Sequence, residues 1–130
     1  MSLILIGDKQ DNVLSKFRET ALSIESSAKI LEANTIIEFH KLTNNKDINL
    51  ILIGPNLEEI SYETVYRLRY VTRYDGPICV VEIAMDKGHS FVQRGTLRAV
   101  AGGQIEYIDG KQKDYLDILS KVVNNLLYYE

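Results

Sequence analysis

The segment Leu50–Ile53 is apolar at every position, and it stops abruptly at Gly54, which a proline follows. A strand with one face in solvent alternates apolar and polar residues, whereas a parallel strand covered on both faces stays apolar throughout. Similar runs occur at Leu3–Ile6 and Ile78–Val81. We therefore expect a parallel sheet with helices packed on both of its faces.

Helical patterns separate the apolar runs, so strands and helices alternate along the chain. The expected strands are Leu3–Ile6, Ala28–Glu32, Leu50–Ile53, Ile78–Val81 and Ile105–Ile108. The expected helices are Asp11–Ile24, a short helix capped at Asn34 or Thr35, a helix from an N-cap at Ser61 through Arg73, and about Asp114–Tyr128. This order predicts an α/β fold: a flavodoxin-like, doubly wound sheet of five parallel strands in the order 2-1-3-4-5.

One stretch, between the fourth and fifth expected strands, is ambiguous. Ser90 followed three residues later by Gln93 matches a capping box that opens a helix toward Val100. Gly95 interrupts that helix, so an extended conformation over Thr96–Val100 stays open.

Composition limits the classes of function. A length of 130 residues fits a single domain over 1–130, and a net charge of -3 without a basic stripe argues against nucleic acid as a partner. No apolar run approaches the roughly 20 residues of a membrane helix, and no signal peptide is recognisable, so a cytoplasmic location without membrane contact is expected. The single cysteine, Cys79, lies in an apolar strand and is expected to be a buried structural thiol.

Three local sequences carry a family resemblance. Leu3–Asp8 is a strand that ends in one acid preceded by Gly7, Gly76–Val81 is a turn and strand, and Gly102–Ile108 is a small-residue turn and a strand with an aromatic at Tyr107. With the order of the strands and helices, they make the chain resemble the CheY-like receivers of bacterial two-component systems, the response-regulator family, over nearly its whole length. The resemblance implies a role in signal transduction.

The residues that carry out the family's chemistry are largely replaced. In the alignment that the resemblance implies, Gly54 stands at the phosphoacceptor aspartate, Glu82 at the hydroxyl residue after the fourth strand, and Gly110 at the lysine after the fifth. Only Asp8 remains of the acidic metal-binding group, since Gly7 replaces its neighbour. These departures resemble the pseudo-receivers, which keep the receiver fold and abandon aspartyl phosphorylation.

Elementary chemistry agrees with this interpretation. Phosphoryl transfer to a carboxylate needs a nucleophilic oxygen, a divalent cation and positive charge. Gly54 has no side chain, and Pro55 lacks a backbone N–H. Asp8 and Glu82 could supply two oxygen ligands to Mg²⁺, but solvated loop carboxylates are the simpler interpretation. We therefore predict a degenerate phosphorylation pocket, no catalytic residue, and no metal or other cofactor.

The leading hypothesis is a non-enzymatic, phosphorylation-independent pseudo-receiver that acts as a regulatory protein–protein interaction module in signalling or protein localisation. Its partner would be another protein, a second copy of the chain or an attached output domain. In ordinary receivers, the fourth helix, fifth strand and fifth helix commonly form the pairing face. The resemblance therefore implies an interaction surface at Arg94, Arg98, Glu106, Tyr107 and Tyr128.

The alternative function is a small-molecule-binding or metal-binding α/β domain that uses the crevice at the C-terminal ends of the strands. The side chains expected to converge on a polar ligand there are Asp8, Asn56, Glu82 and Asp109.

Two further patterns carry weaker expectations. The stretch Tyr62–Tyr74 holds four tyrosines and three arginines, and the favoured interpretation buries the rings while the arginines extend to water. A protein-binding face and, less so, stacking on nucleic acid remain alternatives. His40 and His89 have no partner at metal-ligand spacing, so a zinc site is not expected.

Overall fold

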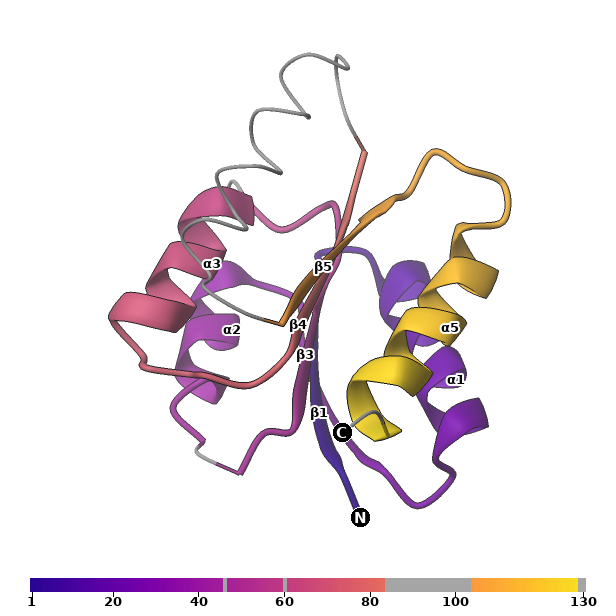
Figure 1. Cartoon of the computed structure of the whole chain (residues 1–130). Coiled ribbons are helices and arrows are strands. Elements are labelled where there is room, and N and C mark those ends of the chain that lie inside the picture. The colour runs from indigo at the N-terminus through magenta and orange to yellow at the C-terminus, as the bar shows by residue number, and fades with distance from the viewer. Residues whose placement is uncertain (46, 60, 84–103, 129–130) are drawn as a thin grey trace.

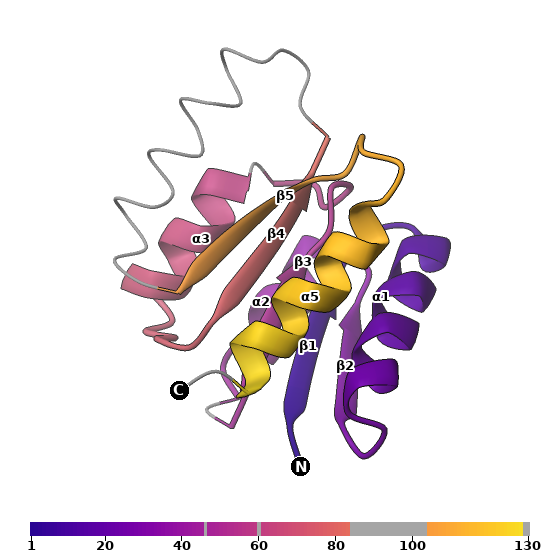
Figure 2. The same ribbon diagram turned by 45° about the vertical axis from the view of Figure 1, so that its right-hand side comes forward.

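A computed structural model describes residues 1–45, 47–59, 61–83 and 104–128, without the side chains of Ser61 and Tyr62. In this part of the chain, five parallel strands form one sheet in the order β2-β1-β3-β4-β5, as predicted; Figure 1 shows the sheet edge-on and Figure 2 labels all of its strands. The strands are β1 (Leu3–Gly7), β2 (Lys29–Ala33), β3 (Leu50–Ile53), β4 (Ile78–Glu82) and β5 (Ile105–Asp109). The helices are α1 (Asp11–Ile24), α2 (Ile36–Leu42), α3 (Ser61–Tyr70) and α5 (Tyr115–Tyr128).

Helices cover both faces of the sheet. Helices α2 and α3 lie on one face and α1 and α5 on the other, an arrangement that is visible from two directions (Figures 1 and 2). In β3, Ile51 and Ile53 pack into the core under α2 and α3, whereas Leu50 and Leu52 pack into the core under α1 and α5. Because successive side chains of a strand point to opposite faces, a strand between two cores must be apolar at every position.

The bounds of most elements follow their local signals. The structure confirms α1 and β3 at the predicted residues, and β2 begins and ends one residue later than predicted. Of the two predicted caps of the second helix, Asn34 and Thr35, the structure selects Thr35, whose side-chain oxygen accepts a hydrogen bond of 3.1 Å from the Glu38 amide. The cap satisfies a backbone donor that has no partner within the helix. The predicted helix from Ser90 toward Val100 lies outside the described residues.

Helix α3 ends earlier than predicted, at Tyr70 rather than Arg73. Arg73 has a φ of 64°, in the left-handed region that stops a right-handed helix. The Arg69 guanidinium then holds the turn, since its Nη1 donates hydrogen bonds of 2.8 Å to the carbonyl oxygens of Tyr74 and Gly76. Tertiary contacts of one arginine therefore override a helical sequence pattern.

We expect substitutions at Arg73 to divide by backbone preference. Arg73→Val should lower the free energy of unfolding by about 1 kcal/mol, because a β-branched side chain is more strained in the left-handed region than the arginine that already occupies it. Arg73→Gly should leave it within about 1 kcal/mol of the unsubstituted chain. Urea denaturation of both variants measures the difference, and equal midpoints for Val and Gly would contradict the assignment.

Two other expectations concern the burial of Cys79 and the presence of membrane-spanning helices. Cys79 is fully buried in β4, as predicted, and burial raises the pKa of its thiol. Within the described residues, no helix has the length and apolar character required to cross a membrane.

Candidate functional site

The C-terminal ends of β1 and β3 are neighbours at one edge of the sheet. Gly7 pairs with Ile53 in the parallel register, and the Gly54 amide donates a hydrogen bond of 2.8 Å to the Gly7 carbonyl oxygen. The residue after β1, Asp8, is thereby brought next to Gly54. This edge is where open α/β sheets place their ligands.

The Asp8 carboxylate is fully buried and receives hydrogen bonds on both oxygens. Oδ1 accepts from the Gln10 amide at 2.8 Å and from Nδ2 of Asn56 at 3.1 Å, and Oδ2 accepts from the Asn56 amide at 3.0 Å. Hydrogen bonds to a charged acceptor are about twice as strong as neutral ones, so this carboxylate ties the loop after β3 to β1. The expectation of a solvated loop carboxylate is wrong for Asp8, because its oxygens face backbone and amide donors rather than water.

Neither glycine at this edge has room for a side chain. A Cβ atom built on Gly54 would lie 2.7 Å from Cγ and 2.8 Å from Cβ of Asp8. A Cβ atom built on Gly7 would lie 2.7 Å from Cε1 of Phe39 and 3.1 Å from Cδ1 of Leu57. The Asp8 side chain thus fills the space beside Gly54, and the aromatic ring of Phe39 fills the space beside Gly7.

The ends of β4 and β5 bring together the remaining residues of the predicted pocket. Glu82 and Asp109 are register partners, and the Gly110 amide donates a hydrogen bond of 2.9 Å to the Glu82 carbonyl oxygen. Asp109 Oδ1 accepts a hydrogen bond of 3.0 Å from the Lys111 amide. Hydrogen bonds therefore link Asp8 to Asn56, and the strand register sets Glu82 beside Asp109 along the same edge.

The electrostatics of the edge reach the start of α5. Burial and the nearby Asp8 carboxylate raise the pKa of Tyr115, because both disfavour a phenolate. Among the residues that the structure describes, no three His, Cys, Asp or Glu side chains gather into a group able to hold a metal ion.

The predicted interaction surface is divided between the two faces of β5. Glu106 is exposed, whereas Tyr107 is half-buried and packs against the core under α2 and α3. Adjacent strand residues point to opposite faces, so these two side chains do not share a patch. Tyr128 is exposed, and its hydroxyl donates a hydrogen bond of 3.1 Å to Glu25. Arg94 and Arg98 lie outside the described residues.

The stretch of tyrosines and arginines differs from the favoured interpretation. Tyr66 and Tyr70 are 45% and 49% exposed, with ring centroids 4.8 Å apart, so these rings are not buried. Tyr74 is mostly covered, and its ring lies under the Arg69 guanidinium at 5.8 Å. Helix periodicity explains the difference, because positions 66 and 70 lie opposite the buried positions Val65 and Leu68.

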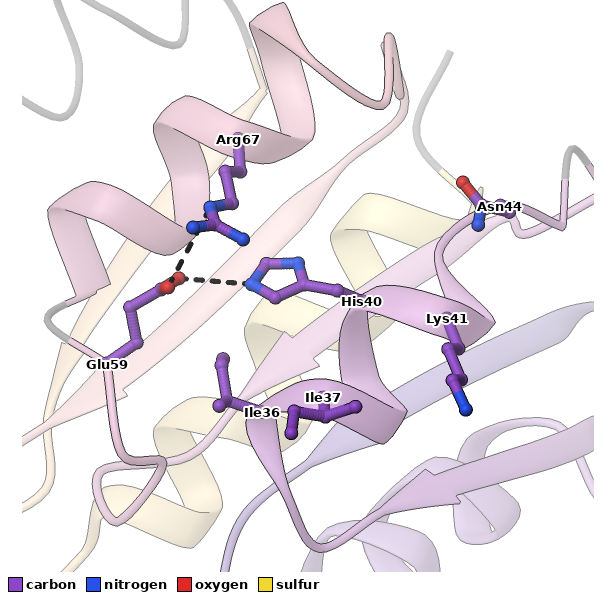
Figure 3. Close-up of a pocket in the computed structure, with 7 residues that line it drawn as sticks. All are labelled: Ile36, Ile37, His40, Lys41, Asn44, Glu59 and Arg67. Atoms are coloured by element: carbon purple, nitrogen blue, oxygen red, sulfur yellow. Dashed lines mark hydrogen bonds and ion pairs between the residues drawn. The ribbon is translucent and has the colours of Figure 1, made fainter.

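Sequence reasoning missed a second feature, an open pocket between α2 and α3 with a volume of about 430 Å³ (Figure 3). It is lined by Ile36, Ile37, His40, Lys41, Asn44, Glu59 and Arg67.

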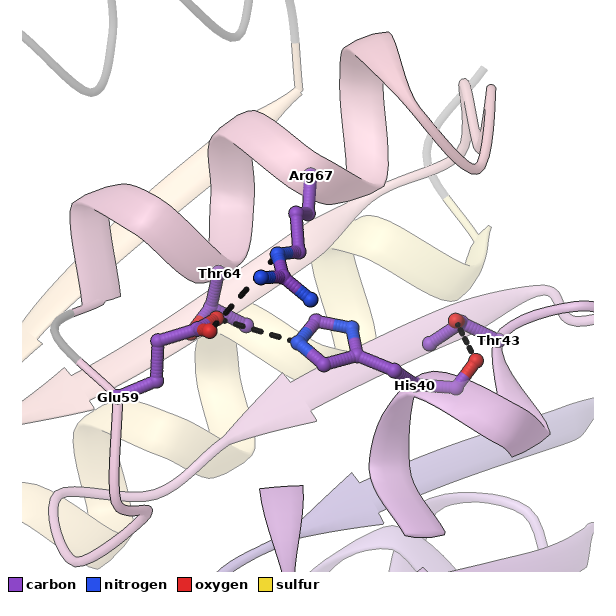
Figure 4. Close-up of polar contacts among 5 residues, drawn as sticks. All are labelled: His40, Thr43, Glu59, Thr64 and Arg67. Atoms are coloured by element: carbon purple, nitrogen blue, oxygen red, sulfur yellow. Dashed lines mark hydrogen bonds and ion pairs between the residues drawn. The ribbon is translucent and has the colours of Figure 1, made fainter. Parts of the chain in front are cut away.

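The polar wall of this pocket is a cluster centred on Glu59 (Figure 4). His40 Nε2 lies 3.1 Å from Glu59 Oε1, the Thr64 hydroxyl donates to the same oxygen at 2.9 Å, and Arg67 Nε lies 3.9 Å from Oε2. The contact between His40 and Glu59 spans 19 residues, so no local spacing signals it. His40 has a carboxylate partner that the sequence did not reveal.

Comparisons with known proteins agree on the fold. No family model and no curated protein matches the sequence. Among solved structures, the chain is similar to a signal receiver domain of a two-component histidine kinase from Clostridium thermocellum, with a TM-score of 0.75 and 15% identity over 98% of both chains.

Two further solved structures are similar over most of the chain. One is a two-component response regulator from Clostridium difficile, with a TM-score of 0.74 and 19% identity over 99% of this chain and 98% of that one. The other is a CheY-like response regulator receiver domain protein from Methanospirillum hungatei, with a TM-score of 0.71 and 20% identity over 97% and 94%. This chain therefore has the fold of the response-regulator receiver domains.

Proposed function

We propose that the chain is a pseudo-receiver, a regulatory protein–protein interaction module that works without aspartyl phosphorylation. It is a single receiver-like domain over residues 1–130, located in the cytoplasm, that binds a partner protein, a second copy of itself or an output domain. No enzymatic step is part of this proposal.

One observation carries the proposal, namely the contact between Asp8 and Gly54. The family resemblance assigns the acceptor carboxylate to position 54, where this chain has only backbone. The volume that an acceptor side chain would need is occupied by a buried carboxylate whose two oxygens already accept hydrogen bonds. A buried, hydrogen-bonded carboxylate is a poor nucleophile, because attack would require it to give up those bonds.

The similar solved structures support the regulatory part of the proposal. Those proteins are described as a response regulator receiver domain protein, a two-component response regulator and a signal receiver domain of a histidine kinase, and the chain covers nearly their whole length. For docking, Glu106 and Tyr128 are exposed residues of β5 and α5, the elements through which ordinary receivers commonly pair.

Incubation of the purified domain with acetyl phosphate and Mg²⁺ should produce no phosphoadduct. Intact-mass measurement before and after incubation detects the added phosphoryl group, and an ordinary receiver treated in parallel provides the positive control. A stable aspartyl phosphate at any position, located by peptide mapping, would overturn the proposal.

The same preparation tests the alternative function, a ligand site at the strand ends. Glu82 and Asp109 lie next to each other there, which favours this site over others for a cation or polar ligand. A ligand that binds only the folded state raises the melting temperature. A rise with Mg²⁺ or a nucleotide that Asp109→Asn removes would favour the alternative, and unchanged melting would favour the interaction module.

A further inference from the structure

We propose that the pocket between α2 and α3 binds an acidic segment of a partner protein, one that carries a carboxylate next to an aliphatic side chain. This inference rests on the proposed function, since it takes the domain to be a binding module, and it names the chemistry of the partner. The pocket lies on the face of the sheet opposite α1 and α5 (Figures 1 and 3).

The geometry of the pocket suits part of a peptide. Its volume of about 430 Å³ lies within the range of ordinary ligand sites, and it is open to solvent, so a bound chain can enter and leave. Arg67 and His40 point toward Glu59 from the two helices, while the Lys41 side chain extends away from that cluster (Figure 3). The pocket thus presents two separate cationic positions, at Arg67 and Lys41.

The charge of the pocket is opposite to that of the chain. The lining has two cations, Arg67 and Lys41, and one carboxylate, Glu59, whereas the whole chain has a net charge of -3. The Glu59 side chain is only 13% exposed, and its carboxylate contacts His40, Thr64 and Arg67. Two cations against one carboxylate leave the formal charge of the lining positive.

Arg67 has N–H donors that its contact with Glu59 does not use. Its side chain is 55% exposed, and its contact with Glu59 is made through Nε at 3.9 Å. A guanidinium carries five N–H donors in a planar fork that fits a carboxylate. Glu38 and Glu63, the carboxylates of these two helices, are not among the residues that line the pocket.

The aliphatic part of the lining selects the neighbouring side chain of the ligand. Ile37 is 69% exposed, and Ile36 beside it is half-buried. Burial of exposed aliphatic surface favours binding in proportion to the area removed from water. A nucleic acid would need more phosphate-binding cations and would gain nothing from two isoleucines, so an acidic aliphatic peptide fits the lining better.

Titration of the ¹⁵N-labelled domain with an acetylated peptide of alternating glutamate and leucine should test this proposal. Amide shifts should change over α2 and α3, and the affinity should fall as salt is added. A lysine–leucine peptide and a glutamate–serine peptide of equal length should each bind at least tenfold more weakly, since one reverses the charge and the other lacks the aliphatic side chains.

Matched variants assign the binding to the pocket. Lys41→Gln with Arg67→Gln removes both cations while keeping polar side chains, and should weaken the glutamate–leucine peptide at least tenfold. Lys16→Gln removes one exposed cation from α1, on the opposite face, and should leave the affinity unchanged. A circular dichroism melt checks that all variants stay folded.

The pocket proposal and the pseudo-receiver proposal are contradicted by different results. Absence of binding at millimolar peptide, equal binding of the lysine–leucine peptide, or an unaltered affinity in the Lys41 and Arg67 double variant would overturn the pocket proposal. The pseudo-receiver proposal fails on a different measurement, formation of a phosphoadduct, which does not depend on the peptide.

Discussion

Gly54→Asp, which restores the acidic residue of an ordinary receiver, is expected to lower the free energy of unfolding by about 3 kcal/mol. The new Cβ atom would lie 2.7 Å from Cγ of Asp8, so the buried Asp8 side chain would have to move and give up its hydrogen bonds. A second carboxylate in the same buried space adds charge repulsion and an unfavourable loss of hydration. Denaturation in urea, followed by circular dichroism, measures the change.

A double-substitution cycle isolates the contact between the two positions. In an Asp8→Ala background the space beside residue 54 is open, so Gly54→Asp should cost about 1–2 kcal/mol less than it does alone. Additive effects of the two substitutions would contradict the contact. Gly110→Ala serves as the glycine control at the same edge, because its Cβ would lie 3.1 Å from Cγ1 of Val81, a tight contact that should cost about 1 kcal/mol or less.

Asp8→Ala is expected to lower the free energy of unfolding by about 2–3 kcal/mol. The substitution removes a fully buried acceptor and leaves the backbone amides of Gln10 and Asn56 without their partner. Leaving a buried donor unsatisfied costs about 1–3 kcal/mol, and the two hydrogen bonds lost here are part-buried, so each contributes toward the lower end of that range. Relief from burying the carboxylate offsets part of the loss, which is why the expected value stays below the sum of the hydrogen bonds.

Hydrogen exchange locates the effect of this substitution. The amides of Gln10 and Asn56 should exchange faster in Asp8→Ala, whereas amides in the centre of β4 should change only with global stability. Asp11→Ala, an exposed aspartate in the first turn of α1, provides the control and should cost less than about 1 kcal/mol. Equal losses for the two alanine variants would refute the role assigned to Asp8.

Much of the fold was predictable because the strands lie between two cores. The apolar runs of β3 and of Ile78–Val81 in β4 indicate burial on both faces, and few topologies combine this with the alternation of strand and helix. The amphipathic stripe of α1 was equally decisive, and its bounds agree with the structure. Local patterns of this kind are strong because they repeat over a whole element.

The candidate sites were predictable only in part. The alignment implied by the family resemblance sets Gly54 at the acceptor position, but the crowding that a side chain would meet there comes from Asp8, which is 46 residues earlier. The contact between His40 and Glu59 was not predictable either, because the two residues come from different parts of the chain. Side chains that meet through the fold leave no periodic signal, so single-sequence reasoning does not detect them.

The amino-acid sequence by itself determined the strands of a sheet covered on both faces and the absence of a side chain at position 54, because these follow from periodicity and residue identity. The tertiary structure alone decided which atoms fill the space at the ends of β1 and β3, where α3 stops, and that α2 and α3 line an open pocket with Lys41 and Arg67 in its wall. These features depend on the distances between side chains far apart in the chain, and such distances are set only when both cores pack.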